Sequence, residues 1–127
     1  IIMENAIIGQ FISTLMSART QAHVFHLQTP SFAAHKALNE FYDEIVDTID
    51  GLVESYQGKH GIVKGYTPAD KFDDFDAKNV LKYFKALATF VERAYDKLDA
   101  KDTYILNQLD NVKELLYTTI YKLENLR

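Results

Sequence analysis

Residues 58–77 read GKHGIVKGYTPADKFDDFDA, and this stretch decides the fold because it interrupts an otherwise regular helical pattern. It holds three of the five glycines, one of the two prolines and four aspartates, and its apolar residues follow no period. We therefore predict a loop of about 20 residues, which is long for a small domain. A short helical turn is expected within it, around Ala69–Phe75.

Two helices are predicted before this loop, since apolar residues there recur at the three-four spacing of a buried helix face. The first helix is predicted from about Met3 to Leu27 and the second from about Ser31 to Gln57. Gly58 suits the left-handed cap after the second helix. The short connection Thr29-Pro30-Ser31 makes the two helices antiparallel neighbours.

Two more helices are predicted after the loop, one along the apolar positions from Val80 to Leu98 and one from Ile105 to Leu123. A polar break separates them, with Asp102 as the expected N-cap. Short, long and short connections predict an all-α domain over residues 1–127, an up-down four-helix bundle with the long crossover between helices two and three. This connectivity is ferritin-like.

The composition excludes several classes of protein. The chain has 127 residues and a mass of 14.6 kDa, which suits a single hydrophobic core. No apolar run reaches the roughly 18 residues of a membrane helix, so we expect a soluble, cytoplasmic protein without a leader sequence. Zero cysteines exclude disulfides and thiolate metal sites. A net charge of -4 and a pI near 5.5 argue against a general nucleic-acid coat.

Histidines and carboxylates gather around the connection between the first two helices. His23, His26 and His35 lie close together in the sequence, and the second helix goes on to carry Asp50 and Glu54. Imidazole and carboxylate groups are the ligands that iron, manganese and zinc take in proteins. A metal site is therefore a hypothesis for this region.

Distance along the second helix prevents its residues from binding one metal ion within a single chain. At about 1.5 Å per residue, His35 and Asp50 are roughly 22 Å apart. Two antiparallel copies of the helix, related by a twofold axis near Glu44, place His35 opposite Glu54 and Asn39 opposite Asp50. We therefore predict a site shared between subunits, present twice in a homodimer across an isologous interface.

The spacing of His23, His35, Asp50 and Glu54 resembles the ferroxidase pattern of the Dps proteins, the miniature ferritins. The similarity covers nearly the whole chain and is greatest to the short Dps-like proteins of some bacteriophages. Further matching positions are Thr20, Gln21, Ala22, Phe32, Asp102, Thr103, Ile105, Leu106, Asp110, Lys113 and Leu116.

This resemblance implies a four-helix subunit assembled into a hollow shell, typically a dodecamer, with a di-iron site at each twofold interface. Fe(II) would be oxidised there by hydrogen peroxide or dioxygen and stored as a ferric mineral. His23 and His35 would be ligands from one subunit, and Asp50 and Glu54 ligands from its partner, with Glu54 bridging the metals. Zinc and manganese are the alternatives to iron.

Two positions depart from the family pattern. Asn39 stands where the family usually has an acidic residue, and Val24 where it tends to have tryptophan after the first histidine. A neutral amide oxygen is a poorer ligand than a carboxylate for a hard cation. His26 could also replace His23 as the ligand, although a hydrogen-bonded place at the edge of the core suits it better. The alternative prediction is a non-catalytic ferritin-like structural or interaction protein with a degenerate metal site.

The remaining charged positions have simpler interpretations. His60 is expected to be an ordinary loop residue, and the acidic run Asp70–Asp76 is expected to cap the third helix. There is no basic arm, and the C-terminus adds only Arg127. We therefore predict no strong nucleic-acid binding and no membrane association.

Overall fold

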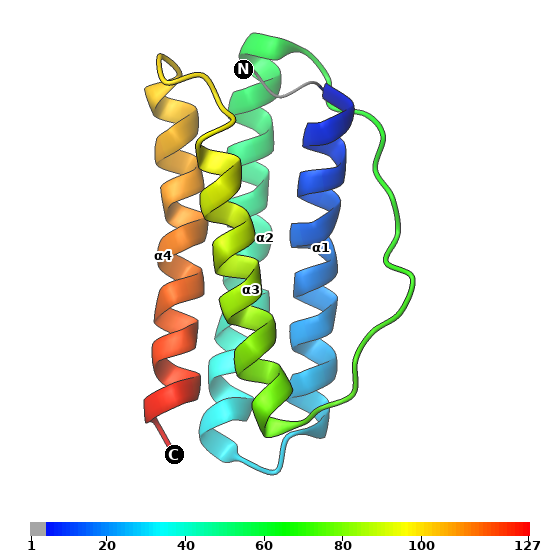
Figure 1. Ribbon diagram of the computed structural model, residues 1–127, viewed down its shortest axis with the longest axis vertical. Helices are drawn as coiled ribbons and strands as arrows, with labels where there is room; N and C mark the ends of the chain where they lie inside the picture. Colours follow the sequence, from blue (N-terminus) through cyan, green and yellow to red (C-terminus); the bar gives the residue numbers. More distant parts are fainter. Residues whose placement is uncertain (1–4) are drawn as a thin grey trace.

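Four long helices account for most of the chain in the computed structural model, which describes residues 5–127. They are α1 (Asn5–Gln28), α2 (Phe32–His60), α3 (Ala77–Tyr95) and α4 (Thr103–Asn125). The segment 61–76 returns along the length of α1 before α3 begins, so α2 and α3 run in the same direction (Figure 1). The predicted all-α bundle with a long loop between its second and third helices is confirmed. The predicted start of the first helix at Met3 lies outside the described residues.

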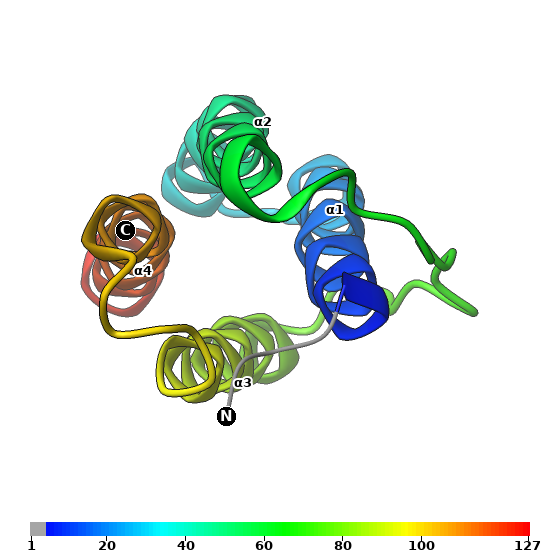
Figure 2. The ribbon, with the colours of Figure 1, turned by 90° about the horizontal axis from the view of Figure 1, so that it is seen from above.

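Seen from above, the helices follow one another around the bundle in the order α1, α2, α4, α3, and every helix runs antiparallel to its neighbours (Figure 2). Close helix contacts join α1 to α2, α2 to α4 and α3 to α4. The largest fully buried side chains are Phe25, Phe41, Phe84, Ile12, Leu15, Leu38, Ile45, Ile105, Leu109 and Leu116. None of the helices in the described range is both long and apolar enough to span a bilayer.

The predicted end of the second helix is wrong by three residues. α2 continues through Gly58 to His60, and its cap is Gly61, whose φ of 90° lies in the left-handed region that favours glycine. The Gly61 N–H donates to the Gln57 carbonyl at 3.1 Å. Gly58 and Gly61 both suit a cap, and the apolar period alone does not choose between them. His60, predicted in the loop, is the last residue of the helix.

α3 begins at Ala77, three residues before the first of the predicted apolar positions, because Asp76 caps its N-terminus. The Asp76 side chain accepts from the N–H groups of Lys78 and Asn79 at 2.8 and 3.4 Å. This confirms a capping role for one member of the acidic run. α3 ends at Tyr95, and Leu98 lies beyond its end.

The predicted helical turn at Ala69–Phe75 is wrong, because the crossover bonds to α1 instead of to itself. The Gln21 amide donates to the Asp73 carbonyl at 2.8 Å and accepts from the Asp73 N–H at 2.7 Å. The Gln28 side chain accepts from the Phe75 N–H at 2.6 Å. Because α1 side chains already satisfy these backbone groups, a local helical turn would provide them with no additional hydrogen bonds.

Gly9 of α1 allows the crossover to lie against the helix. A Cβ at this position would be 2.1 Å from the carbonyl oxygen of Lys64, far inside van der Waals contact. One helical turn further along the same side of α1, the Ser13 hydroxyl oxygen accepts a hydrogen bond from the Thr67 N–H at 2.9 Å. The crossover is therefore fixed along α1 by close contact at one end and by glutamine side chains at the other.

A buried carboxylate joins the end of α2 to the start of α4. Asp102 occupies the N-cap position of α4, as predicted, but its side chain makes no capping bond. Only 3% of the side chain is exposed, and its two oxygens pair with Lys59 and with the His60 ring at 2.7 Å. Hydrogen bonds from Lys59 and then His60 hold the pKa of Asp102 below its ordinary value of 3.8.

Replacing Asp102 by asparagine is expected to lower the melting temperature most at neutral pH. Because the folded-state pKa is depressed, the carboxylate stabilises the fold above about pH 4, and this contribution disappears as the pH falls through the lowered pKa. The difference in melting temperature between wild type and Asp102→Asn should therefore be large at pH 7 and shrink below pH 4. Asp70→Asn, on the exposed crossover, is the control and should show a small difference throughout. A difference that stays constant from pH 7 to pH 3 would contradict this role.

Candidate metal-binding site

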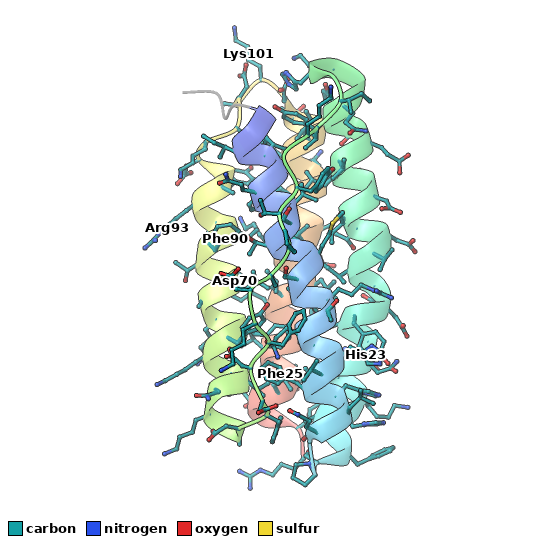
Figure 3. The ribbon with its side chains drawn as sticks, turned by 90° about the vertical axis from the view of Figure 1, so that its right-hand side faces the viewer. His23, Phe25, Asp70, Phe90, Arg93 and Lys101 are labelled. Carbon is teal, nitrogen blue, oxygen red and sulfur yellow. The ribbon has the colours of Figure 1, made fainter. Side chains whose placement is uncertain are left out.

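Three histidines meet where α1 turns into α2. His23 and His26 lie in the last two turns of α1, and His35 lies in the first turn of α2. The His26 and His35 rings stack with their centroids 3.6 Å apart and 20° between their planes, and the His23 ring is 6.0 Å from that of His26. Figure 3 shows His23 at the junction of the two helices. The structure thus brings together the three histidines that the sequence singled out.

His26 and His35 hold each other through their backbones. The Nδ1–H of His26 donates to the His35 carbonyl at 2.7 Å, and the Nδ1–H of His35 donates to the His26 carbonyl at 2.9 Å. A carbonyl can only accept, so both Nδ1 atoms carry hydrogens, and Nε2 is the nitrogen of each ring that can offer a lone pair. Metal-binding histidines are commonly oriented in the same way, by a hydrogen bond that the ring nitrogen not bound to the metal donates.

The two histidines of α1 differ in access to solvent. His26 is 8% exposed, in agreement with the predicted hydrogen-bonded place at the edge of the core. His23 is exposed, and its ring stacks on Tyr42 of α2 with centroids 4.5 Å apart. His23 is therefore the more accessible of the two to a ligand from outside the chain.

Asn39 is held by its neighbours on α2. The Tyr42 hydroxyl donates to Asn39 Oδ1 at 2.7 Å, and Asn39 Nδ2 donates to Asp43 at 3.0 Å. The amide oxygen, the atom that could bind a metal, already accepts one hydrogen bond. The apolar period of α2 predicts no polar role for Tyr42; its place three residues after Asn39 on one helix face was the available signal.

Asp50 and Glu54 lie farther along α2, on its exposed surface, and the structure does not bring them to the histidines. Within residues 5–127, no three histidine or carboxylate side chains lie close enough to bind a metal ion together. A single chain therefore does not form the site by itself. The shared site stays a prediction that needs a second copy.

The outer surface of α2 is strongly acidic. Between residues 40 and 54 the helix carries six carboxylates and no lysine or arginine, namely Glu40, Asp43, Glu44, Asp47, Asp50 and Glu54. All six are exposed, and among them Glu40 forms an ion pair with Lys122 of α4. Such a surface attracts cations from solution, and the attraction weakens as salt concentration rises.

The fourth histidine belongs to a different part of the bundle. His60 pairs with Asp102 at the end of α2 remote from His35, and its ring lies 4.6 Å from that of Tyr56. The sequence does not predict this contact, because Asp102 is 42 residues away along the chain and its position predicts a helix cap. His60 takes no part in the candidate site.

Comparison with known proteins identifies relatives but no activity. Residues 26–123 match the model of a family described as a family of unknown function (DUF5856). An uncharacterized 14.6 kDa protein in the mobD-ri intergenic region of Enterobacteria phage T4 is 37% identical over 60 residues, which are 47% of this chain and 45% of that protein. The chain thus spans about half the length of the curated relative it matches. No solved structure matches the chain.

Proposed function

Because the chain belongs to the DUF5856 family, whose function is unknown, we propose a function from the fold and the site: a Dps-like homo-oligomer that binds and oxidises Fe(II) between subunits. The observation that carries the proposal is the division of the ligand set along α2. Oriented imidazoles lie at one end of the helix and exposed carboxylates at the other, about 22 Å apart. A twofold axis across the middle of α2 would bring one end to the other.

In the proposed site each residue has a defined task. The His35 Nε2 lone pair binds the cation, while the His26 carbonyl fixes the His35 ring by accepting from its Nδ1–H at 2.9 Å. His23, exposed beside Tyr42, supplies the second nitrogen. Asp50 and Glu54 of the partner subunit supply oxygen ligands and balance the charge of the cation. Such a mixed nitrogen and oxygen set suits Fe(II), Mn(II) and Zn(II).

The acidic surface of α2 supports the same proposal. In an antiparallel α2 pair, the carboxylates of both copies approach one another, and like charges close together oppose association. Bound cations relieve this repulsion. Iron is the substrate in this account: the protein collects Fe(II), presents it to peroxide or dioxygen, and retains the ferric product.

A second candidate function is an assembly or interaction protein that has kept the bundle and lost efficient iron chemistry. The specific observation in its favour is Asn39, whose amide oxygen already accepts from Tyr42 and which replaces a potential carboxylate ligand. The stacked pair of His26 and His35 would then serve only to join α1 to α2.

Iron titration tests the proposal and separates the two candidates. Fe(II) is added anaerobically, peroxide follows, and ferric absorbance is recorded for wild type and for Asp50→Asn with Glu54→Ala. The double variant should slow the rapid phase by about tenfold or more, the range seen when metal sites are disturbed. Asp70→Asn with Asp96→Asn changes the charge equally on exposed sites elsewhere and should match wild type. Identical traces for wild type and the Asp50/Glu54 variant would remove the ferroxidase function.

A further inference from the structure

α1 and α3 are neighbours in the bundle, but they approach each other less closely than the other neighbouring helices do (Figure 2). Aromatic rings fill the distance between them: Phe11 of α1 stacks on Phe90 of α3, with centroids 5.3 Å apart and 24° between the ring planes. Beside this pair lies a groove of about 320 Å³, lined by residues of both helices. The groove is remote from the acidic surface of α2, because α3 lies diagonally opposite α2.

The floor of the groove is apolar and partly open to solvent. Phe11 is 6% exposed, whereas Phe90 and Ile7 are 38% and 47% exposed. Phe11 and Ala94 also line a smaller apolar cavity that extends from the groove into the core. Unfilled space behind the Phe11 ring lets the ring shift inward, so the groove can deepen around an apolar chain.

Two cations flank the groove, and none of the described residues that line it is acidic. Arg93 and Lys97 are exposed, and neither forms an ion pair within residues 5–127. Arg93 extends from α3 into solvent (Figure 3). Glu92 and Asp96 are adjacent in the sequence, but at 100° per residue they lie farther around α3 from α1. Both cations can therefore turn toward an anion bound in the groove.

The dimensions of the groove favour a small ligand over a protein partner. Its volume lies at the small end of the range of about 300 to 1000 Å³ for ligand pockets. Ile7 and Phe90 are its two exposed large apolar side chains among the described residues. Two such side chains are few for a protein interface, which buries about 800 Å² on each partner.

We infer that the groove between α1 and α3 binds a single-chain amphiphile with a carboxylate head group, namely a free medium-chain fatty acid. The alkyl chain lies on the Phe11 and Phe90 rings, and the carboxylate accepts hydrogen bonds from Arg93 and Lys97. Burial of CH₂ groups supplies most of the affinity, and the two cations select the head group. This binding site goes beyond the proposed function, since it needs neither iron nor a second copy of the chain.

A tryptophan placed in the groove tests the inference, because the chain contains no other. Phe90→Trp reports on the groove, and Phe72→Trp is the matched control, because Phe72 is equally exposed and the crossover groove beside it has no charged residue in its lining. Sodium decanoate should give Phe90→Trp a saturable shift in emission, with a dissociation constant below about 1 mM. Phe72→Trp should show no saturable shift. Calorimetry of the wild-type protein with decanoate measures the same constant without a substitution.

The head group is tested by removing either charge. Decanol, which has the same chain without the carboxylate, should bind to Phe90→Trp about fivefold more weakly than decanoate. Adding Arg93→Gln with Lys97→Gln should weaken decanoate about fivefold and leave decanol unchanged. The matched control is Lys78→Gln with Lys82→Gln, two exposed cations of α3 that do not line the groove. It should change decanoate binding by less than about twofold.

Several results would overturn the inference. These are the absence of decanoate binding by both fluorescence and calorimetry, an equal response from Phe72→Trp, and equal affinities for decanoate and decanol. A response of Phe90→Trp to poly-glutamate but not to decanoate would assign the groove to an acidic polypeptide and contradict a fatty acid ligand. Decanoate binding that is saturable, specific to Phe90→Trp and dependent on Arg93 and Lys97 would support it, whether or not the protein oxidises iron.

Discussion

Phe25→Ala is expected to lower the free energy of unfolding by about 3 to 5 kcal/mol, the usual range for a buried phenylalanine. The Phe25 side chain is fully buried and meets two rings edge to face: Phe75 of the crossover at 6.4 Å and Tyr83 of α3 at 5.8 Å. It therefore joins three segments that are distant in the sequence. Alanine removes both ring contacts and leaves a cavity where α1, α3 and the crossover meet.

Urea unfolding followed by circular dichroism measures this loss. Phe25→Leu keeps most of the volume and should cost less than about 2 kcal/mol, so it supplies a folded variant if Phe25→Ala fails to fold. Phe72→Ala, at a crossover ring that is 39% exposed, is the control and should cost about 1 kcal/mol or less. Equal losses for Phe25→Ala and Phe72→Ala would show that Phe25 has no special place in the core.

The helices were predictable because their apolar period is set by burial, and burial depends on the bundle as a whole. The end of α2 was less predictable, since Gly58 and Gly61 both suit a cap and only the path of the crossover selects Gly61. The crossover itself was predicted as a loop, but its conformation depends on Gln21 and Gln28, polar side chains of another helix. Side chains that bond to a distant backbone leave no periodic signal.

The candidate site was likewise predictable only in part from the sequence. The sequence placed three histidines near one junction, and helix geometry gave the separation from Asp50. The reciprocal bonds between His26 and His35 depend on how closely α1 and α2 approach at the turn, which the sequence does not encode locally. The pairing of Asp102 with Lys59 and His60 was missed, because a residue at an N-cap position is expected to cap its own helix.

The largest functional effect is expected when the two halves of the ligand set are removed in different subunits. His23→Ala with His35→Ala removes the imidazoles, and Asp50→Asn with Glu54→Ala removes the carboxylates. Each variant alone should lose rapid Fe(II) oxidation, because each homodimer then lacks half of the ligands at both of its sites. Circular dichroism checks that both variants keep their helices.

Mixing these two variants after dissociation and reassociation tests the central claim, that the site is completed by a second copy of the chain. A mixed dimer has one site with all four ligands and one with none. Random pairing of equal amounts should therefore restore about a quarter of the wild-type rate of ferric absorbance change. A mixture no more active than its two parents would contradict a site shared between subunits.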